Sequence, residues 1–195
     1  NHILVSTGNA HKIEEISKIL NLTQFKIESL YDVIKNPPEI IEDGLTFEEN
    51  AIKKVIPFPA EKNRWYLADD SGLIVDGLNG EPGIYSARYA GENASSDMMC
   101  KKILHNLGDN PIRSARFVCV IAIKDPTGKI TSFKGIVEGE ITDTLEGENG
   151  FGYDPIFKPK GFDLSFAEMS QQAKNSISHR FRALHLAELF FKNNI

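Results

Sequence analysis

The stretch HILVSTGNAHKIEEISKIL, residues 2–20, changes its hydrophobic pattern halfway along. Its first part, HILVST, is short, apolar and β-branched, which is typical of a buried strand. The later part, HKIEEISKIL, places Ile13, Ile16, Ile19 and Leu20 on one face at helical spacing. Strand, turn and helix in this order predict the first unit of an α/β fold.

The same alternation continues along the chain. FKIES (25–29) and RWYLAD (64–69) have the pattern of strands, and the acidic pair Asp69 and Asp70 is expected to end the second of them in a turn before SGLIVDGL, a further expected strand. Between them, TFEENAIKKVI (46–56) predicts a helix that begins with a Thr46-x-x-Glu49 capping box and stops before Pro57.

Helices and a hairpin complete the pattern. MMCKKILHNL (98–107) predicts a helix, and the runs 115–125 and 129–141, joined by PTGK, predict an antiparallel hairpin. The segment 165–193 is expected to be mostly helical, starting from a second capping box at Ser165 and Glu168. Strands that alternate with helices and then form a hairpin predict an α/β chain with a mixed sheet.

Composition sets broad limits on function. The chain has 195 residues, 41% hydrophobic and 25% charged, which fits one globular domain. A net charge of -5 argues against a partner such as polymeric nucleic acid. Cys100 and Cys119 have no metal-ligand spacing and are expected to be reduced thiols. Without a signal-peptide pattern or a long apolar run, we expect a cytoplasmic protein with no membrane partner.

A first polar grouping, STGNAHK (6–12), lies between the first strand and the first helix. Small residues let backbone amides approach an anion, the helix N-terminus attracts it, and Lys12 adds a full charge. The Walker pattern is absent, so this is not a P-loop. The motif alone predicts a phosphate-binding loop or, more often, a tight turn with a solvated lysine.

A second grouping consists of carboxylates. Glu42 and Asp43 precede the Thr46 helix, and Asp69 and Asp70 follow an apolar strand. Paired carboxylates are hard oxygen ligands that suit Mg²⁺, which usually binds through one or two carboxylates and the phosphates of the substrate. The alternative is that Asp70 and Ser71 only initiate a turn.

A third grouping combines FGYDPIF (151–157) with the later KNSISHR (174–180). Two aromatic side chains in a glycine-rich loop can stack on a base, and polar side chains can recognise its edges. The alternatives are that the aromatic residues pack in the core and that His179 lies on the surface.

Five blocks resemble, in order and spacing, the inosine triphosphate pyrophosphatases, also called non-canonical purine nucleoside triphosphate pyrophosphatases. They are STGNAHK, GLTFEENAIKK, ADDSGLIVDGLNGEPGIYSARYAGE, GFGYDPIF and SHRFRAL. The resemblance implies an elongated mixed sheet with flanking helices, two lobes around a central substrate cleft, and a homodimer. It spans nearly the whole chain, so residues 1–195 are expected to form one two-lobed domain, with the hairpin of about residues 115–140 as a lobe.

The resemblance also implies a reaction and a site. A purine nucleoside triphosphate such as ITP, dITP or XTP and water would give the monophosphate and pyrophosphate, with Mg²⁺ required. Asp70 would be the catalytic carboxylate and, with Glu42, a metal ligand. The residues implied to bind substrate are Ser6, Thr7, Gly8, Asn9, Ala10, His11, Lys12, Lys54, Ser71, Phe151, Gly152, Tyr153, Asp154, Lys174, His179 and Arg180.

Two other functions stay open. A Maf-like nucleotide pyrophosphatase would have a different base preference, although the SHR block and the GFGYDP loop favour the purine family. A nucleotide-binding module without turnover would bind stoichiometrically and release no pyrophosphate. A Nudix hydrolase is disfavoured because the chain has no REx₂EE-type helix.

Overall fold

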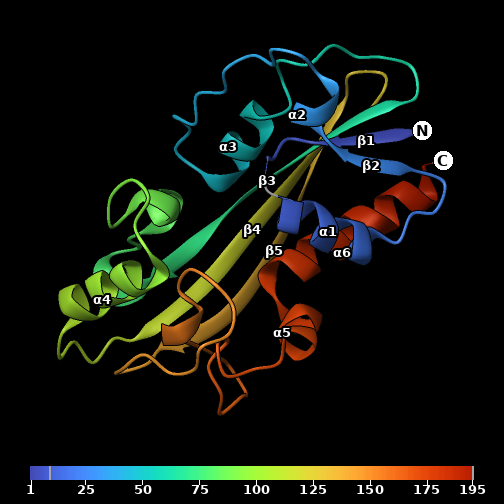
Figure 1. Ribbon diagram of the computed structural model, residues 1–195. Coiled ribbons are helices and arrows are strands. Elements are labelled where there is room, and N and C mark those ends of the chain that lie inside the picture. Colours follow the sequence, from blue (N-terminus) through green and yellow to red (C-terminus); the bar gives the residue numbers. More distant parts are fainter. Residues whose placement is uncertain (9, 195) are drawn as a thin grey trace. The chain divides into compact units, whose positions relative to one another are not determined.

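The computed structural model describes residues 1–8 and 10–194 and shows a mixed six-stranded sheet in the order β2-β1-β3-β4-β5-β6 (Figure 1). Strand β1 (His2–Val5) is parallel to both β2 (Lys26–Ser29) and β3 (Arg64–Val75). Strand β5 (Ile130–Ile141) is antiparallel to β6 (Phe157–Pro159). The predicted α/β class with a mixed sheet and flanking helices is therefore confirmed.

The chain divides into two compact units, each with its own core. Unit 1 contains residues 1–70, 119–135 and 181–195, and unit 2 contains residues 71–118 and 136–180. Strand β4 (Ser114–Lys124) and β5 are joined through the turn at Asp125–Lys129, as predicted, and this hairpin is divided between the two units. In the described part of the chain, no helix has the length and apolar character that crossing a membrane requires.

One face of the sheet in unit 1 is covered by α1 (Ala10–Leu20) and α6 (His179–Asn193), which lie side by side in Figure 1. The predicted apolar stripe of α1 packs there, with Ile16 and Leu20 fully buried. From α6, Leu184 and Phe191 complete the same core. The amphipathic pattern of residues 11–20 thus led to the correct helix and the correct buried face.

Other residues of unit 1 belong to α2 (Leu30–Val33), α3 (Phe47–Lys53) and the segment after it. Phe58 stacks on Tyr66 of β3 with ring centroids 5.0 Å apart, and both rings are buried. The Thr46 hydroxyl accepts from the Glu49 amide at 3.1 Å, so Thr46 caps α3 as predicted, while the Glu49 carboxylate accepts from the Leu45 amide at 2.6 Å. The helix ends at Lys53, before Pro57, as predicted.

Unit 2 has a separate core around α4 (Ser96–Leu107), the predicted helix. Cys100, Ile103 and Leu107 from α4 pack with Leu73 and Val75 of β3. Short 3₁₀ turns shape the loops of this unit, at Asp76–Leu78, Gly83–Arg88 and Asp154–Ile156.

The expected strand end at Asp69 and Asp70 is wrong. β3 runs without interruption from Arg64 to Val75, so both aspartates and Ser71 lie inside a strand. The pairing of β1 with β3 ends at Val5 and Leu67, which places Asp69 and Asp70 just beyond the carboxyl end of β1. The polar residues that looked like a turn are therefore positions of β3 where its parallel neighbour has stopped.

The expected helix start at Ser165 is also wrong. The Ser165 hydroxyl accepts from the Glu168 amide at 3.2 Å, and the Glu168 carboxylate accepts from the Ser165 amide at 2.8 Å. This capping box closes one turn and no helix follows it. Helix α5 (Gln171–Ile177) begins after a new N-cap at Ser170, and Ser178 separates it from α6.

Candidate active site

The loop after β1 is held by hydrogen bonds from neighbouring strands. The Ser6 amide donates to the Leu67 carbonyl at 2.8 Å, and the Ser29 hydroxyl donates to the Thr7 carbonyl at 2.7 Å. Among the described residues, no hydrogen-bond partner lies within reach of the buried Ser6 hydroxyl oxygen. An added Cβ at Gly8 would have Tyr31 as its nearest neighbour, at 4.0 Å, so packing does not require glycine there.

Part of the predicted phosphate loop is not described. Asn9 lies outside the described residues, and for Ala10 and His11 only the backbone, which begins α1, is described. Lys12 follows in the first turn of α1, and its ammonium lies 3.2 Å from both carboxylate oxygens of Asp69. Because the Asp69 side chain is buried, this ion pair ties the start of α1 to β3.

Lys54, at the C-cap of α3, joins the other carboxylates of the predicted site. Its ammonium lies 2.9 Å from Asp70 Oδ1 and 3.0 Å from Glu42 Oε2. It also donates to the backbone carbonyl of Asp69 at 3.1 Å. The structure therefore brings together Glu42, Lys54 and Asp70, as the sequence predicted.

The side chains of Asp69 and Asp70 point to opposite faces, because successive side chains of a strand alternate. Asp69 meets Lys12 of α1, whereas Asp70 meets Lys54 at the end of α3. Each aspartate thus has a lysine from a different helix. The Lys12–Asp69 pair was not predicted, because only spatial proximity, 57 residues apart in sequence, reveals it.

The ionisation of this cluster reflects burial and charge. Burial raises the pKa of Asp70, and the carboxylates of Glu42 and Asp69 add to that rise, while Lys54 opposes it. Burial alone would lower the pKa of Lys54, but Asp70 and Glu42 outweigh it and the net pKa is raised. Among the described residues, no hydrogen-bond partner contacts Asp70 Oδ2. Lys54 therefore stays charged beside a carboxylate with a free, buried oxygen.

A cavity of about 280 Å³ opens beside this cluster. Ser6, Glu42 and Lys54 line it together with residues that the sequence did not single out, namely Tyr31, Pro37, Pro38, Glu39 and Ile40. Tyr31 is half exposed, and nothing in its sequence neighbourhood marked it as a site residue. The phosphate-loop serine, the acidic loop and the Lys54 helix thus border one hollow within unit 1.

The aromatic loop of unit 2 has one exposed ring and one buried ring. Phe151 is 60% exposed, whereas Tyr153 is 4% exposed and donates its hydroxyl to the Ser86 carbonyl at 2.7 Å. Burial raises the pKa of the Tyr153 phenol. The two aromatic residues therefore differ in environment: Tyr153 packs in the core, and the Phe151 ring is largely exposed.

Asp154 and Lys174 form a buried ion pair under this loop. The Asp154 carboxylate also accepts from the Phe151 amide at 2.8 Å. The Lys174 ammonium lies 4.6 Å from the centre of the Phe151 ring and 5.6 Å from that of Phe166, within cation–π range. The structure brings Phe151, Asp154 and Lys174 together, as predicted.

His179 and Arg180 begin α6 and are both buried. The surface alternative for His179 is therefore wrong. Its ring stacks on Phe117 of β4 at a centroid distance of 4.8 Å and an interplanar angle of 11°. The sequence showed Phe117 only as a strand residue and gave no sign of this contact. Ser71, also predicted to bind substrate, is partly buried at the point where β3 enters unit 2.

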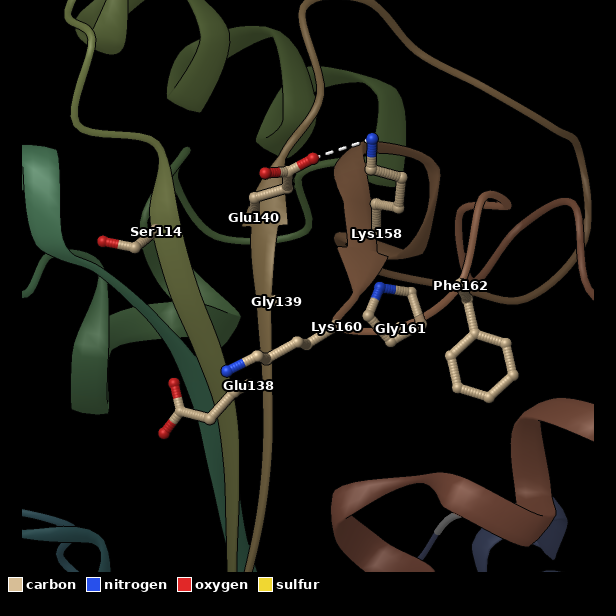
Figure 2. A pocket seen from close by; sticks show the side chains of 9 residues that line it. Ser114, Glu138, Gly139, Glu140, Lys158, Lys160, Gly161 and Phe162 are labelled. Carbon is tan, nitrogen blue, oxygen red and sulfur yellow. Dashed lines mark ion pairs between the residues drawn. The ribbon is translucent and has the colours of Figure 1, made fainter.

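A second cavity, of about 520 Å³, lies along β5 and β6 in unit 2 (Figure 2). Its lining includes Glu138, Glu140, Lys158 and Phe162, and Lys158 pairs with Glu140 at 2.7 Å. None of the residues predicted to bind substrate lines it. The larger of these two cavities is therefore not the one that the predicted residues line.

Glu42 and Asp70 could supply part of the coordination shell of a divalent cation. Oxygens of the substrate phosphates and of water would have to complete it. In residues 1–8 and 10–194, no group of three or more His, Cys, Asp or Glu side chains is arranged to hold a metal ion. Glu42 and Asp70 nevertheless meet at Lys54, and Asp70 Oδ2 is free to coordinate. Mg²⁺ usually needs only one or two protein carboxylates besides phosphate oxygens and water.

Comparisons with known proteins agree over almost the whole chain. A curated "dITP/XTP pyrophosphatase" of Staphylococcus aureus strain MW2 is 43% identical over 192 residues, covering 98% of this chain and 97% of that protein. One from Geobacter sulfurreducens is 46% identical over 186 residues, covering 94% and 93%. A protein with the same name from Oceanobacillus iheyensis is 44% identical over 189 residues, covering 95% of each.

Solved structures show the same fold. The Ham1 protein of Staphylococcus aureus superposes with a TM-score of 0.92 at 42% identity and covers 100% of both chains. A HAM1 protein from Coxiella burnetii gives a TM-score of 0.89 at 38% identity, with 98% of both chains covered. The sequence model described as "Ham1 family" matches residues 3–189. This chain therefore belongs to the Ham1 family.

Proposed function

We propose that this chain is a nucleoside triphosphate pyrophosphatase that hydrolyses deaminated purine nucleotides, ITP, dITP and XTP, to the monophosphate and pyrophosphate. Relatives that are 43% and 46% identical are named dITP/XTP pyrophosphatase. The observation that carries the proposal is the Lys54 ammonium, 2.9 Å from Asp70 and 3.0 Å from Glu42 beside a cavity. This arrangement combines a cation for phosphates with carboxylates for water and metal.

Phosphate binding is proposed for Ser6, Lys12 and Lys54. A nucleoside triphosphate carries about four negative charges, and attack on phosphorus requires that positive groups offset them. Lys54 lines the cavity, and Lys12 lies at the start of α1, where the helix N-terminus adds partial positive charge. Ser6 lines the same cavity with a buried hydroxyl that can donate to a phosphate oxygen.

Asp70 is proposed to orient and deprotonate the water that attacks the α-phosphorus. A carboxylate whose pKa is raised is a better proton acceptor than an ordinary one, and burial gives Asp70 this property. Lys54 holds Oδ1, so the oxygen available to accept the proton is Oδ2. The positive charge of Lys54 would stabilise the negative charge that develops on the departing pyrophosphate.

Magnesium dependence is part of the proposal. Glu42 and Asp70 would hold the ion, since carboxylate oxygens are ligands of the kind that Mg²⁺ prefers. When bound, Mg²⁺ would supply positive charge for the leaving pyrophosphate. The Lys54 ammonium already contacts the carboxylates of Glu42 and Asp70. Lys54 and the ion would therefore share these two carboxylates.

Recognition of the base is proposed for Phe151 and the polar residues near it. Phe151 offers an exposed ring on which a purine can stack, and Gly152 beside it carries no side chain that would interfere. Hypoxanthine and xanthine present an acceptor at O6 and a donor at N1, whereas adenine presents the reverse. A hydrogen-bond donor from Lys174, His179 or Arg180 would pair with O6. In adenine the same donor would face the 6-amino group, which is also a donor.

The assembly and location remain expectations of this proposal. We expect a homodimer, which sedimentation of the purified chain at several concentrations would detect. A single species with the 21.7 kDa mass of one chain at all concentrations would exclude the dimer. A cytoplasmic location is expected because the proposed substrates arise in the nucleotide pool used for nucleic acid synthesis.

Product analysis tests the cleavage position. The chain is incubated with ITP, and the products are separated by ion-exchange chromatography. We expect IMP and pyrophosphate in equal amounts. IDP and inorganic phosphate would show attack at the γ-phosphorus and would refute the proposed reaction. Tight binding of ITP without either set of products would support the nucleotide-binding module instead.

A further inference from the structure

The loop 151–154 is anchored to α4 through the backbone of one glycine. The Gly152 amide donates to the Ser96 hydroxyl at 2.8 Å, and the Cys100 thiol donates to the Gly152 carbonyl at 3.3 Å. Ser96 and Cys100 are four residues apart on α4, so they lie on the same face one turn apart. Both backbone groups of Gly152 are thus held by side chains of a single helix.

This anchor adds to the hydrogen bond within the loop from the Phe151 amide to the Asp154 carboxylate. Gly152 has φ of +64° and its missing Cβ would have no neighbour within 4 Å, so packing does not hold it. The Phe151 ring next to it is largely exposed. Hydrogen bonds to α4 therefore hold the backbone directly next to the Phe151 ring.

The Cys100 thiol is suited to act as a hydrogen-bond donor to the Gly152 carbonyl. Cys100 is fully buried, and burial, aided by the carboxylates of Asp154 and Asp97, raises its pKa to about 12. The sulfur therefore keeps its proton and remains a donor at neutral pH. A weak donor is sufficient here because the carbonyl it meets is a good acceptor.

We propose that Ser96 and Cys100 are positioning residues that fix the loop 151–154 and thereby set the base selectivity of this enzyme. The inference rests on the proposed function, because selectivity is measured on purine triphosphates. Neither residue touches the substrate in this proposal. They act through the Gly152 backbone on the ring of Phe151 and on the Asp154–Lys174 pair that follows it.

Two neighbouring serines give a matched test. Ser96→Ala removes the acceptor of the Gly152 amide, whereas Ser95→Ala removes the N-cap acceptor of the Met98 amide in the same helix. We expect Ser96→Ala to raise KM for ITP about tenfold with a much smaller change in kcat, and to lower the preference for ITP over ATP by a similar factor. Ser95→Ala should lower thermal stability and leave both kinetic quantities close to those of the unmodified chain.

Two buried cysteines give a second matched pair. Cys100→Ala removes the donor to Gly152, whereas Cys119→Ala removes a fully buried sulfur from the core of unit 1. Only Cys100→Ala should lower the preference for ITP over ATP. Cys100→Ser, which restores a donor, should recover part of the preference. An equal effect of Cys100→Ala and Cys119→Ala would overturn the inference for the thiol.

Hydrogen exchange separates this inference from the proposed function. The Gly152 amide of the full chain should be protected in the unmodified chain and in Ser95→Ala, and should exchange at least about tenfold faster in Ser96→Ala. An unmodified chain that releases no pyrophosphate from any purine triphosphate would refute the function, and with it the link to selectivity. An active chain whose selectivity and Gly152 exchange are both unchanged by Ser96→Ala would overturn the inference alone.

Discussion

Asp69 and Asp70 show how one residue step along a strand can separate two functions. Asp69 is buried and paired with Lys12, which gives it a structural link to α1. Asp70 faces Lys54 and Glu42 and keeps one oxygen free. Because the two side chains leave the strand on opposite faces, their charges are offset by different lysines. For this reason we propose Asp70, and not Asp69, as the catalytic carboxylate.

Replacing Asp70 with asparagine tests that assignment. Asn keeps the shape and an acceptor for Lys54 but cannot take a proton from water. We expect kcat for ITP to fall by about 10² to 10⁴-fold, the usual contribution of a general base. Thermal unfolding should change little, since Lys54 retains Glu42 as a partner.

The matched control is Asp43→Asn. Asp43 pairs with Lys53 on the exposed part of the same acidic loop. Activity close to that of the unmodified chain is expected for Asp43→Asn. An Asp70→Asn variant as active as Asp43→Asn would remove Asp70 from the catalytic role.

Lys174 is predicted to be important for stability as well as for base binding. Lys174→Met removes the partner of Asp154 and leaves a carboxylate that is buried. We expect the free energy of unfolding to fall by about 3–5 kcal/mol, as when one member of a buried ion pair is removed. Urea denaturation provides the measurement.

A second substitution distinguishes lost charge balance from lost packing. The double variant Asp154→Asn with Lys174→Met removes the uncompensated charge and should recover part of the stability. The Asn side chain can still accept from the Phe151 amide. A double variant less stable than Lys174→Met would contradict the view that the carboxylate is the source of the loss.

Local signals in the sequence identified elements but not always their ends. The same capping-box pattern begins α3 at Thr46 and closes only one turn at Ser165, although the hydroxyl accepts from the amide three residues later at both places. The pattern specifies a local set of hydrogen bonds, and whether a helix follows depends on packing beyond it. For the same reason, Asp-Asp-Ser-Gly looked like a turn and proved to be the middle of β3.

The loop 150–154 requires glycine at position 150 for a steric reason. Gly150 has φ of +78°, and an added Cβ would lie 2.1 Å from Asp154 Oδ2. Gly150→Ala should therefore displace the carboxylate from the Phe151 amide and weaken its pairing with Lys174. We expect a loss of thermal stability together with a higher KM for ITP.

Gly152→Ala is the control for backbone strain. Gly152 has φ of +64°, so alanine there pays a similar conformational cost of about 1–2 kcal/mol, but its Cβ would meet nothing within 4 Å. Gly150→Ala should be the less stable of the two by urea denaturation. Equal stability would show that the contact with Asp154 does not matter.

Local patterns in the sequence predicted which helix residues pack in the cores, but not which distant segments meet. Helix stripes such as Ile16 and Leu20 of α1 follow from periodicity and were placed correctly. Contacts between distant segments, such as Lys12 with Asp69 or Phe117 with His179, depend on the fold and left no local pattern. The family resemblance supplied the groups of site residues, and the structure brings Glu42 to Lys54 and Asp70, and Phe151 to Asp154 and Lys174.

The most direct test is pyrophosphate release from ITP, XTP, GTP, ATP and dTTP, each measured with and without Mg²⁺. We predict rapid release from ITP and XTP that depends on Mg²⁺, and values of kcat/KM for ATP and dTTP lower by about 10²-fold or more. Equal kcat/KM for all five nucleotides, or turnover of ITP that does not change when Mg²⁺ is removed by chelation, would contradict the proposed site.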